Sequence, residues 1–208
     1  MTSAAFLAAG PGNRKSKLAA LRQFFAWART RKLVLADPTR GLTARGPLGF
    51  RGPTVALPLQ RQLFRRWRGS KDAHPHESVT GLLALLHGAT CAELRGLVIT
   101  DIDAAAQAIQ LGRRPAPTPL DPATWTAVQR CLDHRAQLGT ANPHVVVTRQ
   151  TKSTREPASA YYLSHILDAA GVRPQLLRST RLAELVNTLD PKLVSAAFGM
   201  RPEGVTTT

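Results

Sequence analysis

Residues 88–97 read GATCAELRGL. The run just before them, residues 79–86, is almost continuously apolar, which predicts a buried core helix. A second, short helix is expected within the quoted stretch itself. Downstream, residues 108–111 and 118–120 predict two short strands on either side of the sequence GRRP. The quoted stretch therefore connects a buried helix to a β-hairpin.

The rest of the chain is predicted to be mainly helical. A helix from about residue 59 carries an apolar stripe of Leu63, Phe64 and Trp67, which we interpret as core and not as a platform for stacked bases. We recognise no internal repeat. The other expected elements are a helix that opens at Asp121-Pro122, a third strand at residues 145–147, and final helices at about 158–170, 175–188 and 191–199.

These elements divide the chain into three parts. Residues 1–42 hold a small helical piece, residues 43–58 form a linker rich in Gly and Pro, and residues 59–208 form the main domain. The predicted fold class is mainly α with a small antiparallel β-sheet. A chain of 208 residues with 43% hydrophobic residues can bury a real core.

Charge is the strongest global signal. The chain has 28 Lys plus Arg against 13 Asp plus Glu, a net charge of +15 and a pI near 11.4. Such an excess points to a polyanionic partner, which leaves DNA, RNA and an anionic membrane surface, whereas a merely solubilising charge would mix both signs more evenly. The arginines expected to contact phosphates lie in the linker (Arg45, Arg51), in the helix after it (Arg61, Arg65, Arg66, Arg68) and in the hairpin (Arg113, Arg114).

A membrane location is not expected. The longest apolar stretch, residues 81–86, is too short to span a bilayer, and no signal peptide is recognised. The cytoplasm is therefore the default location.

Metal and disulfide chemistry are not expected either. Cys91 and Cys131 form no Cys-x-x-Cys pair, which argues against a disulfide framework and a structural zinc site. His74, His76 and Glu77 cluster around a proline, and a solvated loop is favoured there over a metal site. We predict no metal and no cofactor.

Several short motifs occur in a familiar order. Residues 88–97, with Asp-Ile-Asp at 101–103, are similar to the Gly-x-Arg-x-x-Glu-Leu-x-x-Leu box of the tyrosine recombinases, or phage integrases, and its trailing Asp-Ile-Asp. The predicted hairpin matches the one that follows this box. Leu-Arg-Ser-Thr at 177–180 matches the second box of the family, and Phe-Gly-Met at 198–200 stands where a Leu-Gly-His turn is expected.

The resemblance extends to the N-terminal part. Phe-Phe-Ala-Trp-Ala at 24–28, followed by Asp-Pro at 37–38 and Gly-Leu at 41–42, is similar to the end of the family's helical, SAM-like core-binding domain. The first helices of that domain are absent here. The resemblance thus implies a partial core-binding domain at 1–42 and an integrase-like catalytic domain at 59–208 that lacks its C-terminal end.

The resemblance also implies a chemistry. In this family a tyrosine hydroxyl attacks the scissile phosphate, and two arginines clamp the nonbridging oxygens of the transition state. A lysine on the hairpin and one or two histidines handle protons and charge. The resemblance further predicts that Thr90 and Arg178 lie close together on one concave basic face. The hairpin around Arg113 is expected to border the same face.

The family's catalytic residues are poorly matched in this sequence. Arg178 matches the second arginine, but the first arginine falls on Thr90 and the histidine before the second box falls on Gln175. The final histidine or tryptophan falls on Met200, and the hairpin lysine has no match. Neither threonine, glutamine nor methionine can replace an arginine fork or an acid–base group.

The nucleophile has no match either. Tyr161 and Tyr162 are the only tyrosines, and both precede Arg178. The family's tyrosine follows the last histidine turn by about nine residues, which places it at or just past Thr208. We interpret Tyr161 and Tyr162 as packing residues on a helix face.

Three hypotheses follow. The first is a protein that binds double-stranded DNA and resembles a recombinase of DNA integration and recombination, but is cleavage-deficient, such as a remnant of a mobile element. Whether it forms a homo-oligomer on DNA is left open. The alternative is a fragment of an active recombinase whose tyrosine lies beyond residue 208. The third is an unrelated basic helical RNA-binding protein, against which the lack of an aromatic-rich sheet motif argues.

Overall fold

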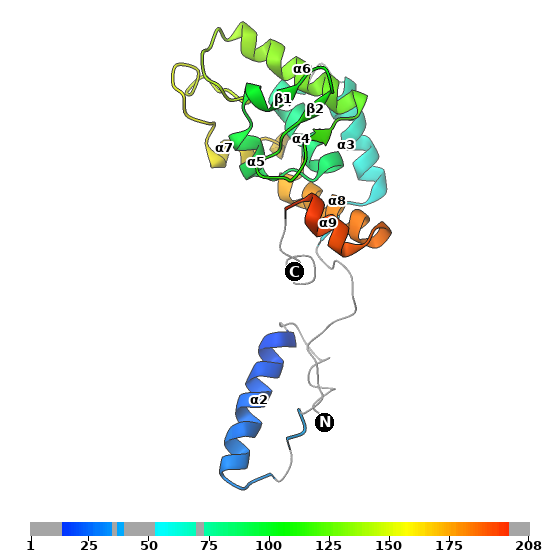
Figure 1. Cartoon of the computed structure of the whole chain (residues 1–208), viewed down its shortest axis with the longest axis vertical. Helices are drawn as coiled ribbons and strands as arrows, with labels where there is room; N and C mark the ends of the chain where they lie inside the picture. The colour runs from blue at the N-terminus through cyan, green and yellow to red at the C-terminus, as the bar shows by residue number, and fades with distance from the viewer. Residues whose placement is uncertain (1–13, 35–36, 40–52, 70–72, 200–208) are drawn as a thin grey trace. The chain divides into compact units, whose positions relative to one another are not determined.

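The computed structural model describes residues 14–34, 37–39, 53–69 and 73–199 (Figure 1). The chain forms two compact units, Met1–Leu48 and Gly49–Thr208. In the first unit, helix α2 runs from Arg14 to Thr30, with Leu18 and Ala28 buried as its apolar spacing predicts.

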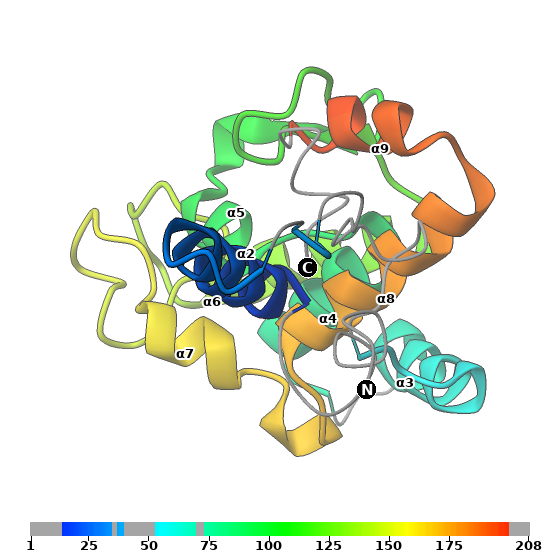
Figure 2. The same cartoon turned by 90° about the horizontal axis from the view of Figure 1, so that it is seen from below.

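The core of the second unit forms around helix α4, Pro75–His87. It packs against α3 (Leu57–Gly69), α6 (Pro122–Gln137) and α8 (Pro174–Thr188). Figure 2 shows α4 in the middle of this unit, with α3 and α8 beside it. Because neighbours surround α4, its second half, residues 81–86, is apolar on all sides, and Leu82 and Leu83 are fully buried. The predicted buried core helix is confirmed.

Trp67 fixes how α3 meets α4. Its side chain is fully buried, so its interpretation as core is confirmed. A Cβ at Gly81 would lie 2.5 Å from the Trp67 ring, which shows that the indole lies directly on the backbone of α4. Only glycine allows this close approach of the two helices. Helix α3 begins at Leu57, inside the stretch predicted as linker.

A small antiparallel sheet lies beside the helices. Its strands are β1 (Ile102–Asp103), β2 (Ala108–Ile109) and β3 (Thr118–Pro119), in the order β1-β2-β3. In its register Ile109 pairs with Ile102 on one side and with Thr118 on the other. The two predicted strands of the hairpin are confirmed as β2 and β3.

The third strand was predicted in the wrong place. Residues 145–147 are buried valines, but only His144 next to them makes an isolated bridge, to Val98. A short apolar run marks burial without distinguishing a strand from another buried segment. Here the valines enter the core as irregular chain, and β1 takes the edge of the sheet.

The remaining elements complete a mainly helical fold. The helix predicted at about 158–170 is in fact α7 (Ala160–His165) followed by a 3₁₀ turn at Asp168–Ala170. Helices α8 and α9 (Pro191–Ala197) lie close to their predicted bounds. The short helix expected in the opening stretch is α5, Cys91–Gly96, and a 3₁₀ turn at Ile99–Asp101 leads into β1. The predicted fold class is confirmed. Within the described residues, no helix is long and apolar enough to cross a membrane.

Candidate functional site

Thr90 begins helix α5. Its hydroxyl oxygen accepts a hydrogen bond from the Glu93 backbone N–H at 3.0 Å, and the Glu93 carboxylate accepts one from the Thr90 N–H at 2.7 Å. This reciprocal pair is a capping box, which satisfies two backbone donors at the start of a helix. The position where the resemblance places the first arginine is thus used here to cap a helix of six residues.

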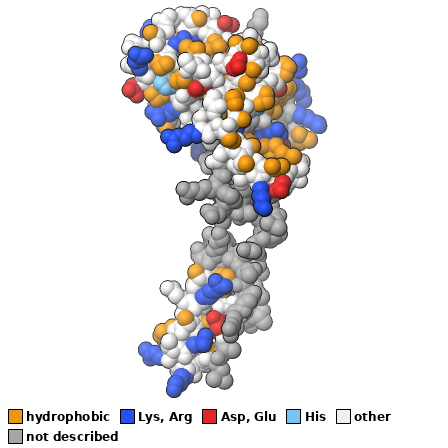
Figure 3. Space-filling view, viewed as in Figure 1, with side chains coloured by type: hydrophobic (Ala, Val, Ile, Leu, Met, Phe, Trp, Pro, Cys, Tyr) orange, Lys and Arg blue, Asp and Glu red, His pale blue; other side chains and the backbone are white. Residues whose placement is uncertain are grey.

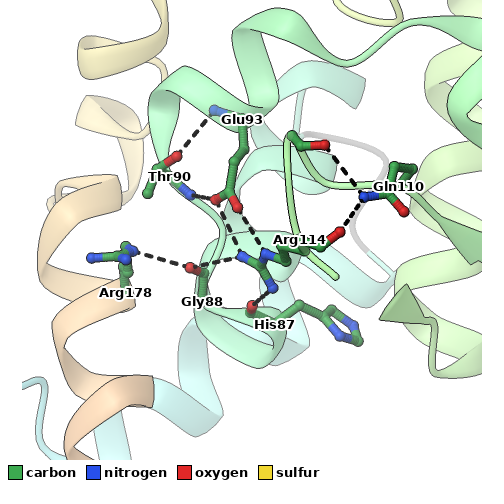
Figure 4. A network of polar contacts seen from close by, with 8 residues as sticks. His87, Gly88, Thr90, Glu93, Gln110, Arg114 and Arg178 are labelled. Carbon is green, nitrogen blue, oxygen red and sulfur yellow. Dashed lines mark hydrogen bonds and ion pairs between the residues drawn. The ribbon is translucent and has the colours of Figure 1, made fainter. Parts of the chain in front are cut away.

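Gly88 ends helix α4 and joins two arginines. Its φ of +60° is left-handed, and a Cβ there would lie 2.8 Å from the Phe198 ring. Its carbonyl oxygen accepts hydrogen bonds from Arg114 at 3.3 Å and from Arg178 at 3.2 Å. Figure 4 shows the two guanidinium groups approaching this carbonyl from opposite sides. The glycine therefore holds together segments that are far apart in the sequence.

Arg114 is a buried structural residue. Its guanidinium forms a bidentate pair with Glu93, at 2.7 and 3.1 Å, and donates to the His87 carbonyl at 3.0 Å. It also lies 4.6 Å from the centre of the Phe198 ring and is only 8% exposed. The phosphate contact predicted for Arg114 is therefore wrong, because these partners occupy the group that would bind DNA.

Glu93 is held in its charged form by this pairing. Burial alone would raise the pKa of its carboxyl, but hydrogen bonds from Arg114 and from the Thr90 backbone outweigh burial and keep that pKa below its ordinary value. A carboxylate paired in this way stays ionised at neutral pH.

Arg178 meets Thr90 and Gln175 at one cavity. The cavity has a volume of about 310 Å³ and is lined by Ala89, Thr90, Cys91, Ala92, Gln175 and Arg178. The expected closeness of Thr90 and Arg178 is confirmed. Burial and nearby Arg114 lower the pKa of Arg178 despite the opposing effect of Glu93, but guanidinium groups remain protonated in proteins.

The cavity can bind an anion better than it can transfer a proton. Among the described residues that line it, Arg178 supplies a charged fork, and Gln175 and Thr90 supply neutral polar groups. Burial raises the pKa of the Cys91 thiol, so it is protonated at neutral pH and a poor nucleophile. This donor set is suited to binding the oxygens of a phosphate but not to catalysing a reaction at that phosphate.

The arginines of α3 lie elsewhere. Arg61 and Arg65 are exposed and line a separate hollow with Arg181, and Arg68 lines another with Asp121. Hence none of these exposed α3 arginines lines the cavity of Thr90 and Arg178.

Arg66 differs from its neighbours on α3. It pairs bidentately with Glu77, at 2.7 and 3.2 Å, and the same carboxylate accepts from the Trp67 indole at 2.9 Å. The side chain of Glu77 is 5% exposed, so the pair anchors α3 to α4. Arg66 therefore has a structural role, and its side chain is still 34% exposed.

The tip of the hairpin lies against the turn after α9. Arg113 is exposed, and its carbonyl lies 3.6 Å from the position of a Cβ at Gly199. The turn after α9 therefore lies against the hairpin. Arg45, Arg51 and Met200 lie outside the described residues.

Histidines form a separate cluster at the start of α4. The rings of His74, His76 and His134 lie 4.6 to 5.2 Å apart, centre to centre. Burial lowers the pKa of His76 to about 3, so its ring is neutral at pH 7. Among the described residues no group of three His, Cys, Asp or Glu side chains is arranged to hold a metal ion.

Neither tyrosine lines the cavity of Arg178. The Tyr162 hydroxyl lies 2.8 Å from His76 Nδ1, and burial raises its pKa to about 12. Its interpretation as a packing residue is confirmed. Tyr161 instead is 74% exposed and stacks on His165, with ring centres 4.1 Å apart.

Solved structures identify the fold. No protein-family model and no curated protein matches the chain. The crystal structure of XerA recombinase matches with a TM-score of 0.62 and 15% identity, over 92% of this chain and 69% of that one. The Tn1549 transposon integrase in complex with a circular intermediate DNA matches with a TM-score of 0.56 and 16% identity, over 92% and 73% of the two chains.

A second structure of the same integrase, in complex with transposon right end DNA, matches with a TM-score of 0.56 and 14% identity, over 92% and 72% of the two chains. The chain has a tyrosine recombinase-like fold. Within this fold, the two stretches that resemble the family's first and second boxes both line the cavity of Thr90 and Arg178.

Gly88→Ala is expected to lower the free energy of unfolding by about 1–3 kcal/mol. An alanine at a left-handed φ is strained, and its Cβ would displace Phe198 from Arg114. Gly96→Ala is the matched control. Gly96 is the last residue of helix α5, and no heavy atom lies within 4 Å of a Cβ added there. Urea denaturation measures both. Equal stability of the two variants would contradict the role given to Gly88.

Proposed function

We propose that this protein binds double-stranded DNA through phosphate contacts and does not break the strands. The observation that carries the proposal is the composition of the cavity. Arg178 brings the fork that binds phosphate oxygens, while Thr90 and Gln175 bring no second fork and no acid–base group. The site thus has the groups for holding a backbone phosphate but not those for activating it.

The charge of the chain supports a nucleic-acid partner. The net charge is +15, and Figure 3 shows that Lys and Arg side chains of the larger unit lie mostly toward its edges in this view. Solved structures with the same fold include an integrase in complex with DNA. The proposed phosphate contacts come from Arg178, from the exposed arginines Arg61, Arg65, Arg68 and Arg113, and from Arg45 and Arg51.

The internal losses favour binding over catalysis. Thr90 is committed to capping α5, and the space beside Gly88 is occupied by Arg114, whose charge is balanced by Glu93. We propose that the chain is a degenerate relative of enzymes of DNA recombination and integration, with a core-binding-type region at 1–42, a linker that ends before α3 begins at Leu57, and a catalytic-type domain that includes α3 and the elements after it. This reading explains Thr90 and Gln175, which a missing C-terminal segment would leave unexplained.

The test compares two arginines of helix α8, one of them at its N-cap. Arg178→Gln is expected to weaken duplex binding about 10-fold. The slope of log affinity against log salt concentration should become shallower by about 1. Arg173→Gln removes the same charge five residues earlier, at the start of the helix, from an exposed side chain that lines a different hollow with Asp168. It should change affinity by less than about 2-fold. Fluorescence anisotropy with a labelled duplex measures both, and equal losses would overturn the phosphate site at Arg178.

A further inference from the structure

A short repeat occupies the loop between α6 and α7, at residues 148–156. The sequence reads TRQ, TKS, TRE, so that a threonine, a cation and a polar or acidic residue recur three times. The loop is the yellow-green trace that precedes α7 in Figure 1. It contains no apolar side chain that could anchor it in the core.

Hydrogen bonds give the repeat a regular backbone. The Thr151 N–H donates to the Thr148 carbonyl, and the Thr154 N–H donates to the Thr151 carbonyl, each at 3.1 Å. The Thr151 hydroxyl oxygen accepts from the Thr148 N–H at 3.1 Å, and the Thr154 hydroxyl oxygen accepts from the Glu156 N–H at 3.2 Å. Arg149 and Lys152 therefore hold the same position in two successive turns.

One buried amide ties this loop to the fold. Asn142 is 1% exposed, and its side-chain N–H groups donate to the Thr151 carbonyl at 2.8 Å and to the Glu156 carbonyl at 2.9 Å. Its side-chain oxygen accepts from the His144 N–H at 2.9 Å. A polar loop held in this way loses less conformational entropy when it binds a partner.

The loop presents a basic surface. Arg149, Lys152 and Arg155 are all exposed, and Glu156 is the only acidic residue among the nine. We propose that this loop is a further contact to the backbone of duplex DNA, separate from the cavity of Arg178. The proposal rests on the proposed function. The loop has no aromatic platform for stacked bases, and bases within a duplex are already stacked on one another, so we expect the contact to be with phosphates and independent of sequence.

The experiment compares two double variants that lose the same residue types. Arg149→Gln with Lys152→Gln removes the two cations at equivalent turn positions. Arg173→Gln with Lys192→Gln is the matched control, because both side chains are exposed and belong to other segments. The slope of log affinity against log salt should become shallower by about 2 in the loop variant and by less than about 0.5 in the control. Affinity for the duplex at low salt should fall about 10- to 100-fold in the loop variant alone.

The outcomes separate this proposal from the proposed function. If the unmodified protein binds with a steep salt slope and the two double variants behave alike, the loop contact is overturned and DNA binding stands. If the unmodified protein does not bind duplex DNA at low salt, the proposed function fails and the loop contact fails with it. Circular dichroism melting curves verify that the variants are folded, which is expected because all four residues are on the surface.

Discussion

The affinity of the purified protein for duplex DNA is expected to fall about 10³- to 10⁵-fold between about 50 and 200 mM salt. Each neutralised phosphate releases condensed counterions, and about 6–10 contacts produce a fall of this size. The fold can supply that many, because exposed cations lie on α3, on the hairpin tip and on the loop at 148–156, in addition to Arg178. Anisotropy titrations over a salt series measure the slope.

A duplex of unrelated sequence is the control for this first prediction. Phosphate contacts carry no sequence information, so both duplexes should give the same slope. An affinity that stays flat over the salt range would contradict the electrostatic basis of the proposed function. A much higher affinity for one duplex at the same slope would show that base contacts contribute as well.

Much of the fold could be predicted from the sequence because its signals are local. The apolar run of α4 and the turn residues between β2 and β3 each determine the structure of their own segment. The closeness of Thr90 and Arg178 could not be derived from local pattern, since 88 positions separate them. It followed from the order of the family's motifs, and the cavity that both residues line confirms it.

The role of Arg114 could not be predicted from charge alone. Arg113 and Arg114 are neighbouring residues of the same type, yet Arg113 is exposed while Arg114 is buried and paired with Glu93. A partner 21 residues away decides which of the two can meet DNA. One part of this network was readable: Thr90 and Glu93 have the spacing of a capping box, which indicates that Thr90 starts a helix.

The loop at 148–156 shows a different limit. Its three-residue unit is too short to indicate a structural repeat. A segment this rich in Thr, Ser and Arg is typical of an ordinary solvated loop. What orders it is Asn142, whose buried amide binds carbonyls on both sides of the loop's centre. A single asparagine gives no such signal in the sequence, so only the structure reveals it.

The largest catalytic effect is expected from restoring the cavity. The unmodified chain should form no covalent adduct with a suicide DNA substrate, and a tyrosine appended after Thr208 should by itself leave adduct formation very slow. Adding Thr90→Arg and Gln175→His to that tyrosine version should raise the rate by at least about 10²-fold. Loss of one donor at a developing oxyanion typically costs about 10²–10³ in rate, and losses that act together are not additive.

The structure also defines the control for this rescue. Thr90→Arg removes the cap of α5 at a cost of about 1 kcal/mol, so a folding check must accompany the rate. Thr90→Ser in the same tyrosine version keeps the cap without adding charge, and it should give no rescue. The readout is a shifted covalent band on a denaturing gel. Such a band from the unmodified chain would overturn the proposal that this cavity only binds, because it would mean that strand cleavage proceeds without a second arginine at position 90 or a histidine at position 175.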